Sequence, residues 1–296
     1  MVAGVFALAG AHAGWLVLAV LLHVGGQVSR GVAWRGVLAV SWPHVTRRRV
    51  CAWYVCGAGL SGLLSVRGGD ALRATLAKRE LKDATWPALA GTLAAEASLE
   101  SACGVLLVLS AVWLGVGTLD APSPVLVAAA AVAVGAVVTL AVRSQRVRRA
   151  VCEVGRGLAV LRRPGCWARG VLPWQVLSRA LRLASATCFL LAFGLPVAPA
   201  VVVAACLAQG SGGAMPLPGA GPATAGAALL VAIPLAGHAV DQGAVASLAI
   251  VWPAALTAVG VTLSLVLLAH VCGARTPLAL VRAARALRAQ PAPLTP

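Results

Sequence analysis

Five stretches of this sequence are apolar over a length that can cross a lipid bilayer. They lie at about 5–28, 86–117, 124–142, 176–195 and 244–272. Roughly 20 apolar residues are enough for a spanning helix, and an α-helix satisfies its own backbone N–H and C=O groups inside the hydrocarbon core. The sequence therefore predicts an all-α fold, a polytopic α-helical membrane protein.

The composition agrees with a membrane protein and sets the class of partner. Hydrophobic residues make up 60% of the chain and charged residues only 11%, against about 25% charged in soluble domains. The formal net charge of +16 would suggest nucleic acid as the partner of a soluble protein. Here the basic residues flank the apolar spans, where they act as topology signals and headgroup contacts. We therefore expect membrane lipids, and no nucleic acid, as partners.

Residues 50–66 form a first interrupted apolar segment. They are short and rich in glycine, with arginines at 47–49 before them and Arg67 and Arg73 after them. The positive-inside rule assigns both basic flanks to the cytoplasm. The segment must then enter the membrane and return, as a re-entrant hairpin near 50–73. The bilayer tolerates such a hairpin only where its broken backbone is buried in protein or lines a cavity.

Residues 198–236 form a second interrupted segment with the opposite flanks. Two short apolar runs surround a stretch rich in glycine and proline, and the linkers 195–199 and 237–243 contain no Lys or Arg. The segment is predicted to enter from the outside as the mirror image of the first. A tight extracellular loop between two short helices is the alternative. Paired interrupted segments in corresponding halves indicate an inverted repeat with a transport site at its interface.

The chain divides into four parts on this basis. Residues 1–142 form a first membrane half, 143–173 a basic cytoplasmic linker, 174–274 a second membrane half, and 275–296 a basic amphipathic tail. We expect about 6–8 membrane segments, of which one or two are broken hairpins, and a cytoplasmic C-terminus. The linker is either a solvated connector or a helix lying on anionic lipid.

Two carboxylates lie inside an apolar span. Glu96 and Glu100 are four residues apart, so they share one face of a helix. An ionised side chain at membrane depth costs roughly 3 kcal/mol or more unless it is paired, protonated or directed into a polar cavity. We therefore predict a functional site here. The alternative is that helix neighbours or an arginine at the cytoplasmic end satisfy both groups.

A third set of candidates closes the first hairpin. Gly68 and Gly69 would let the chain turn and bring its amides near a ligand. Arg67 and Arg73 could then hold a phosphate while Asp70 orients one of them. The alternative is an ordinary loop with an Asp–Arg pair at the start of a helix.

The second interrupted segment adds four backbone candidates. Pro216, Pro218, Gly219 and Gly221 forbid a continuous helix and leave amides and carbonyls free for a ligand. They complete the predicted headgroup path.

No motif for chemical catalysis is present. The sequence contains no nucleotide-binding loop, metal motif or nucleophile elbow, and its eight cysteines form no Cys-x-x-Cys pair. The histidines at positions 12, 23 and 270 are isolated along the chain, and we expect them to be satisfied within the bundle. The prediction is a protein that is not an enzyme, with no catalytic residue, no cofactor and no metal site.

These segments together resemble a known family. The runs Gln27-Val-Ser-Arg-Gly-Val-Ala-Trp-Arg35, Gly59-Leu-Ser-Gly-Leu-Leu-Ser-Val-Arg-Gly-Gly-Asp-Ala-Leu-Arg73 and Met215-Pro-Leu-Pro-Gly-Ala-Gly221 occur in order around the Glu96–Glu100 helix. In this they are similar to the lysylphosphatidylglycerol synthase transmembrane-region family, whose flippase-like members accompany some glycosyltransferases. The chain departs from the family pattern at Ser65, Ala97 and the pair 223–224. The resemblance starts at what would be the family's second helix, so an N-terminal helix is expected to be missing or the start misassigned.

The resemblance implies a lipid translocase in the plasma membrane of a bacterium. Its cargo would be an aminoacylated phospholipid or an isoprenoid-linked glycolipid, carried between leaflets. The alternatives are a membrane subunit that serves a partner glycosyltransferase or aminoacyltransferase, and a scaffold or regulator that transports nothing. The sequence does not give the oligomeric state.

Overall fold

The computed structural model describes residues 12–64, 66–114, 152–212, 220–239 and 241–271 of the 296. All regular structure within these ranges is helical, which confirms the all-α prediction. Some predicted features lie outside the described residues: the apolar span 124–142, the tail 275–296, and Pro216, Pro218 and Gly219.

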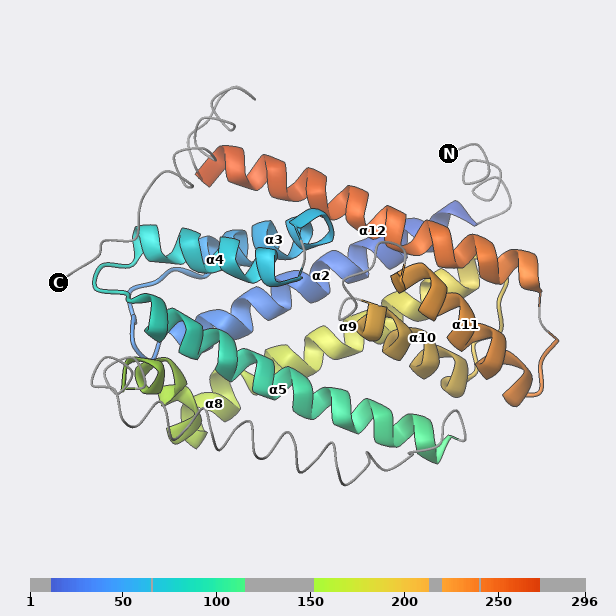
Figure 1. Ribbon diagram of the computed structural model, residues 1–296, viewed down its shortest axis with the longest axis horizontal. Helices are drawn as coiled ribbons and strands as arrows, with labels where there is room; N and C mark the ends of the chain where they lie inside the picture. Colours follow the sequence, from blue (N-terminus) through green and yellow to red (C-terminus); the bar gives the residue numbers. More distant parts are fainter. Residues whose placement is uncertain (1–11, 65, 115–151, 213–219, 240, 272–296) are drawn as a thin grey trace.

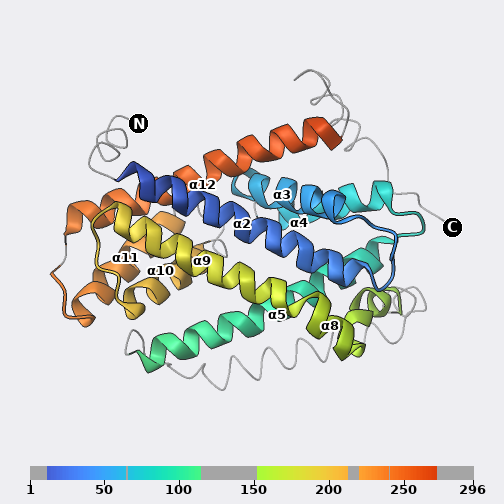
Figure 2. The same ribbon diagram turned by 180° about the vertical axis from the view of Figure 1, so that it is seen from behind.

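Four long helices set the length of the molecule. They are α2 (Ala13–Leu38), α5 (Trp86–Trp113), α9 (Leu172–Ala192) and α12 (Gln242–Val271). Helices α2 and α9 pack side by side over most of their length (Figures 1 and 2). Residues Ala13–Leu38 and Gln242–His270 are long and apolar enough to cross a membrane, by length and composition. The total of 6–8 membrane segments stays a prediction.

The first interrupted segment is a helical hairpin. Helix α3 (Arg47–Leu64) is followed by α4 (Val66–Glu80), which returns along it. Gly68 and Gly69 lie in the first turn of α4 and not in the turn between the helices, so the predicted position of the chain turn is wrong, whereas contact of their amides with a ligand stays a prediction. Gly69 instead lets the two helices approach, because a Cβ there would lie 2.9 Å from the Cβ of Ser61.

The second interrupted segment is also a pair of packed helices. Helix α10 (Pro199–Gly212) and α11 (Ala220–Leu235) lie at the opposite end of the bundle from α3 and α4, as Figure 1 shows. Each hairpin begins and ends at its own end of the molecule. Entry of the two hairpins from opposite sides of a membrane stays a prediction.

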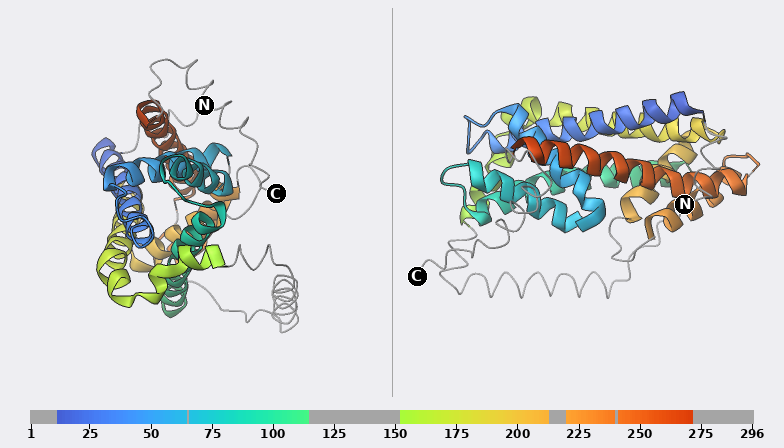
Figure 3. Two further views of the ribbon diagram at one scale, coloured as in Figure 1. Left: turned by 90° about the vertical axis from the view of Figure 1, so that its left-hand side faces the viewer. Right: turned by 90° about the horizontal axis from the view of Figure 1, so that it is seen from above.

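One end of the bundle carries many of the described basic residues, and we call it the basic end. The starts of α3 and α5 and the ends of α2 and α4 meet there, together with a short 3-10 helix η1 (Leu158–Arg162) and α8 (Pro164–Gly170) (Figure 3). The Ser41 hydroxyl donates to the carbonyl of Arg156 at 3.2 Å, and Thr85 pairs with Glu153. The described part of the predicted linker is therefore folded against the bundle.

Two apolar cores fill the bundle, one near each end. The core at the basic end is built around Trp34, Trp53 and Leu89. The core at the opposite end is built around Phe189 and Trp252, whose rings stack with centroids 5.0 Å apart. Van der Waals packing of this kind holds helices together in lipid, where burial of apolar surface gives little gain. The stretches of α2, α9 and α12 between the two cores carry polar and small residues: His23, Gln27, Arg30, Arg179, Arg182, Thr257, Gly260 and Ser264.

Helices α3 and α12 cross within this middle layer at two glycines. A Cβ at Gly59 would lie 2.6 Å from the carbonyl carbon of Gly260 and closer still to its oxygen. Ser264 locks the crossing, because its hydroxyl donates to the carbonyl of Val55 at 3.0 Å. The close approach needs a residue without a side chain.

We therefore expect Gly59→Ala to destabilise the protein by about 1–3 kcal/mol, since the added methyl group has no space. Thermal unfolding in detergent, followed by circular dichroism, measures this. Gly104→Ala is the matched control on α5, because a Cβ there meets no atom within 4 Å. Equal unfolding temperatures for the two variants would contradict the close approach of α3 and α12 at Gly59.

Candidate functional site

Glu96 lies at the centre of a buried set of charges. Its side chain is 1% exposed, and its two oxygens lie 3.3 Å from Arg30 Nη2 and 2.6 Å from Arg73 Nη1. Helix α2 supplies Arg30 and α4 supplies Arg73, so this one carboxylate on α5 joins three helices. Charge-assisted hydrogen bonds of this kind are the strong ones in a low-dielectric interior.

Arg73 is held from several sides at once. Its Nη2 lies 2.8 Å from Asp70 Oδ1 one turn earlier in α4. Its guanidinium group lies 5.1 Å from the ring centroid of Trp34 and 4.8 Å from that of Tyr54, within range of the attraction between a cation and an aromatic face. These contacts fix its orientation toward Glu96.

Glu100 extends the set one turn along α5. It pairs with Arg30, and its Oε1 lies 3.2 Å from Arg179 Nη2 and 3.7 Å from Arg182 Nη1 on α9. Its side chain is 34% exposed. We call these seven residues the charged cluster: Asp70, Glu96, Glu100, Arg30, Arg73, Arg179 and Arg182. Four guanidinium groups face three carboxylates, which leaves one positive charge in excess.

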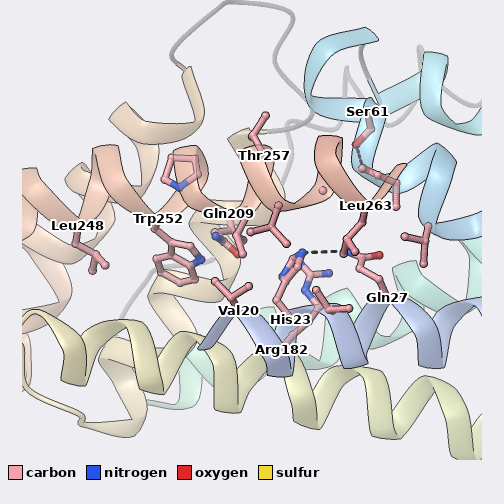
Figure 4. A pocket seen from close by; sticks show the side chains of 18 of the residues that line it. Val20, His23, Gln27, Ser61, Arg182, Gln209, Leu248, Trp252, Thr257 and Leu263 are labelled. Atoms are coloured by element: carbon pink, nitrogen blue, oxygen red, sulfur yellow. Dashed lines mark hydrogen bonds between the residues drawn. The ribbon is translucent and has the colours of Figure 1, made fainter. Parts of the chain in front are cut away.

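A cavity of about 370 Å³ adjoins the charged cluster at Arg182. We call it the central cavity. Its wall comes from α2, α3, α9, α10, α11 and α12, so both hairpins contribute to it. Figure 4 shows His23, Gln27, Gln209 and Trp252 around it, with Arg182 below. Most of the remaining lining residues are aliphatic.

Arg182 also lines a second, smaller cavity of about 240 Å³. Arg179 and Arg182 are its charged residues, and the rest of its wall is Leu106, Leu107, Val176, Leu183 and Cys206. Arg182 therefore lines both cavities and contacts Glu100 of the charged cluster.

The family comparison matches residues 5–264 to the family described as the lysylphosphatidylglycerol synthase TM region. The match covers most of the 296 residues. The chain belongs to this family. No curated protein and no solved structure matches it. As a family member it is an integral membrane protein of a lipid-related family, as the resemblance implied.

Several of the predicted site residues of this family member meet in the structure. Asp70, Arg73, Glu96 and Glu100 all belong to the charged cluster. Gly68 and Gly69 lie one turn before Arg73, on α4. Arg67 lies in the same turn of α4, and Gly221 lies near the start of α11. Pro216, Pro218 and Gly219 lie outside the described residues.

Sequence reasoning missed the arginines that complete the cluster. Arg30 is part of a quoted family run, but its partner sixty-six residues away is not visible from sequence. Arg179 and Arg182 lie three residues apart in the apolar stretch 176–195. They carry the same signal as Glu96 and Glu100, an ionised group inside a predicted span, and that signal could have found them.

Sequence reasoning also missed the residues of the central cavity. His23, which we expected to be satisfied within the bundle, is hydrogen-bonded to Gln27 with the two Nε2 atoms 3.2 Å apart, yet both side chains line the cavity. Among the described residues, no group of three His, Cys, Asp or Glu side chains is placed to hold a metal ion.

We expect Glu96→Gln to destabilise this family member by about 3–5 kcal/mol, the cost of leaving a buried partner charge unpaired. Glu100→Gln should cost less, because its carboxylate is more exposed. Thermal unfolding of both variants in the same detergent gives the comparison. If Glu100→Gln lowers the unfolding temperature as much as Glu96→Gln does, the burial of the carboxylate does not determine the loss of stability.

Proposed function

We propose that this family member is a lipid translocase. It carries an aminoacylated phospholipid or an isoprenoid-linked glycolipid between leaflets, with the headgroup passing the charged cluster and the central cavity. The observation that carries the proposal is the burial of Glu96 between Arg30 and Arg73, in a cluster whose Arg182 lines a cavity to which both hairpins contribute.

Burial of charge supports a transport role. Ionisable groups inside membrane segments are costly, and they typically mark substrate or ion pathways. Here four arginines and three carboxylates gather between two apolar cores. A bundle that only had to be stable could fill this layer with apolar residues at equal or lower cost.

The position of the cavity supports the same role. Transporter sites lie where discontinuous segments from two halves of the chain meet near the middle of the membrane. Helix α3 of the first hairpin and helices α10 and α11 of the second contribute to the wall of the central cavity. The excess positive charge suits a lipid phosphate, since arginine binds phosphate through paired N–H donors.

Orientation and partners follow from the same proposal. The basic end would face the cytoplasm of a bacterium, in agreement with the positive-inside rule, and the C-terminus would lie on that side. The protein would move lipid without chemical change. A glycosyltransferase or aminoacyltransferase that makes the lipid would be its functional partner.

Lipid movement in proteoliposomes tests the proposal. Fluorescent phospholipids and isoprenyl-phosphate lipids are followed across bilayers that contain the purified protein. We expect the wild-type protein to accelerate movement and the double variant Glu96→Gln, Glu100→Gln to lose most of the acceleration. The variant removes every carboxylate partner of Arg30, Arg179 and Arg182 and leaves Arg73 with Asp70 alone.

Glu153→Gln is the control in this experiment. It makes the same chemical change in a carboxylate at the basic end, away from the central cavity, so it should transport at the wild-type rate. Folding of each variant is checked by size-exclusion chromatography. No movement of any lipid by folded wild-type protein would refute translocation and favour a scaffold or regulatory role.

A further inference from the structure

The central cavity contains buried polar atoms with no partner in the protein. Trp252 is 3% exposed, and its indole Nε1 makes no hydrogen bond. The side-chain oxygen of Gln27 is also buried and unpaired, although its Nε2 is bonded to His23. Figure 4 shows the indole nitrogen on the side of the ring that faces Gln209. A buried polar atom without a partner costs free energy of folding, and a polar ligand in the cavity would supply the missing partners.

Arg182 supplies the charge at this place. Its ion pair with Glu100, at 3.7 Å, is the longest in the charged cluster. Glu100 is already engaged by Arg30 and Arg179. Arg182 therefore retains N–H donors that can be turned toward the cavity. Together with the Trp252 N–H and the side-chain amide of Gln209, it offers N–H donors to a ligand, whereas Gln27 offers its unpaired side-chain oxygen as an acceptor for a hydroxyl group.

No carboxylate is present to receive a positive charge. None of the described residues that line the central cavity is acidic. The chain has eight acidic residues in all, and three of them are paired with arginines in the charged cluster. Glu80 pairs with Arg49 and accepts from Trp53, and Glu153 binds Thr85.

The three remaining acids do not line the central cavity in the described structure. Asp83 lies between α4 and α5 at the basic end, and Asp241 accepts from the backbone of Ala244 at the start of α12. Asp120 lies outside the described residues. An ammonium group placed in the cavity would lie near Arg182, with no carboxylate among the described wall residues to bind it, and such juxtaposition of like charges disfavours binding.

The size and the wall of the cavity fit a headgroup. About 370 Å³ falls in the lower part of the roughly 300–1,000 Å³ range of ligand pockets, enough for a headgroup and not for a whole lipid. The indole of Trp252 forms one wall, and an aromatic ring gives a flat apolar surface with a polar edge. Pro253 lies inside α12 and has no N–H, so it cannot donate to the carbonyl of Ala249 one turn earlier. Both residues line the cavity, so this carbonyl is a further acceptor for a hydroxyl group.

We infer that the central cavity binds an anionic phosphate headgroup that bears hydroxyl groups and no ammonium group. This rests on the proposed lipid transport and selects among its cargoes. Of the two proposed cargoes it favours the isoprenoid-linked glycolipid over the aminoacylated phospholipid, and it also allows an unmodified glycerol headgroup on the phosphate. Arg182 binds the phosphate, and Gln27, Gln209 and Trp252 bind its oxygens and the hydroxyl groups.

Equilibrium binding to the purified full chain in detergent tests the inference apart from transport. The probes are short-chain phosphatidylglycerol, short-chain lysylphosphatidylglycerol, a short isoprenyl phosphate that carries one sugar, and free glycerol phosphate. We expect at least one of the two anionic lipids to bind about tenfold or more tightly than the lysyl lipid, by calorimetry. Comparison of phosphatidylglycerol with the isoprenyl phosphate sugar also shows which of the two anionic lipids the cavity prefers.

Two variants and one control link the result to the cavity. Arg182→Gln should weaken binding of the anionic lipid about tenfold or more, the scale of one hydrogen bond to a charged group. Gln209→Glu adds a carboxylate and should shift the preference toward the lysyl lipid. Arg156→Gln, which removes an arginine at the basic end, should bind as the wild type does. Thermal unfolding confirms that each variant is folded.

Three results would overturn the inference. They are equal affinity for the lysyl lipid and both anionic lipids, unchanged affinity in folded Arg182→Gln, and binding of free glycerol phosphate as tight as that of the lipid. Failure of transport with this binding intact would count against the translocase proposal alone. Transport without this selectivity would count against the present inference alone.

Discussion

The structure depends on one constraint, that a charge buried among membrane helices must be paired. Glu96 meets it by contacting Arg30 on α2 and Arg73 on α4, and Glu100 meets it through Arg30 and two arginines of α9. Four helices are thereby joined through two side chains of α5. Apolar packing sets how closely the helices approach, but it permits sliding. The ion pairs have defined partners, so they fix the register of α2, α4, α5 and α9.

The same layer explains why the hairpins matter. A continuous helix fills the interior of a bundle with its side chains. Two short hairpins that enter from opposite ends leave a space for the central cavity between them. Gly57 and Gly69 hold the first hairpin together, and Gly59 brings it against Gly260 of α12. The close contacts leave little free volume there. The central cavity opens beside them, between α3 and the second hairpin, where Arg182 connects it to the charged cluster.

Charge balance distinguishes this site from a structural ion pair. A pair that only stabilises a fold is neutral, whereas the charged cluster has one guanidinium group more than its carboxylates can match. The surplus belongs to Arg182, whose contact with Glu100 is the longest and which lines both cavities. Of the chain's eight acids, three are used in the cluster and none is present among the described residues of the cavity wall. This charge balance supports the proposed binding of an anion.

The amino-acid sequence by itself determined the helical membrane class, the two interrupted segments and the position of Glu96 and Glu100 inside an apolar stretch, which made them site candidates. These follow from local composition, because the length of an apolar run and a charge within it are readable without knowing the fold. The partners of those charges were decided only by tertiary structure. Arg30 and Arg182 both reach Glu100 from positions far apart in the chain. Gln209 and Trp252 share a cavity only because α11 packs against both α10 and α12. The separation of two residues along the chain does not give their distance in space once they lie on different helices. The cavity and its charge balance could therefore not be derived from the sequence.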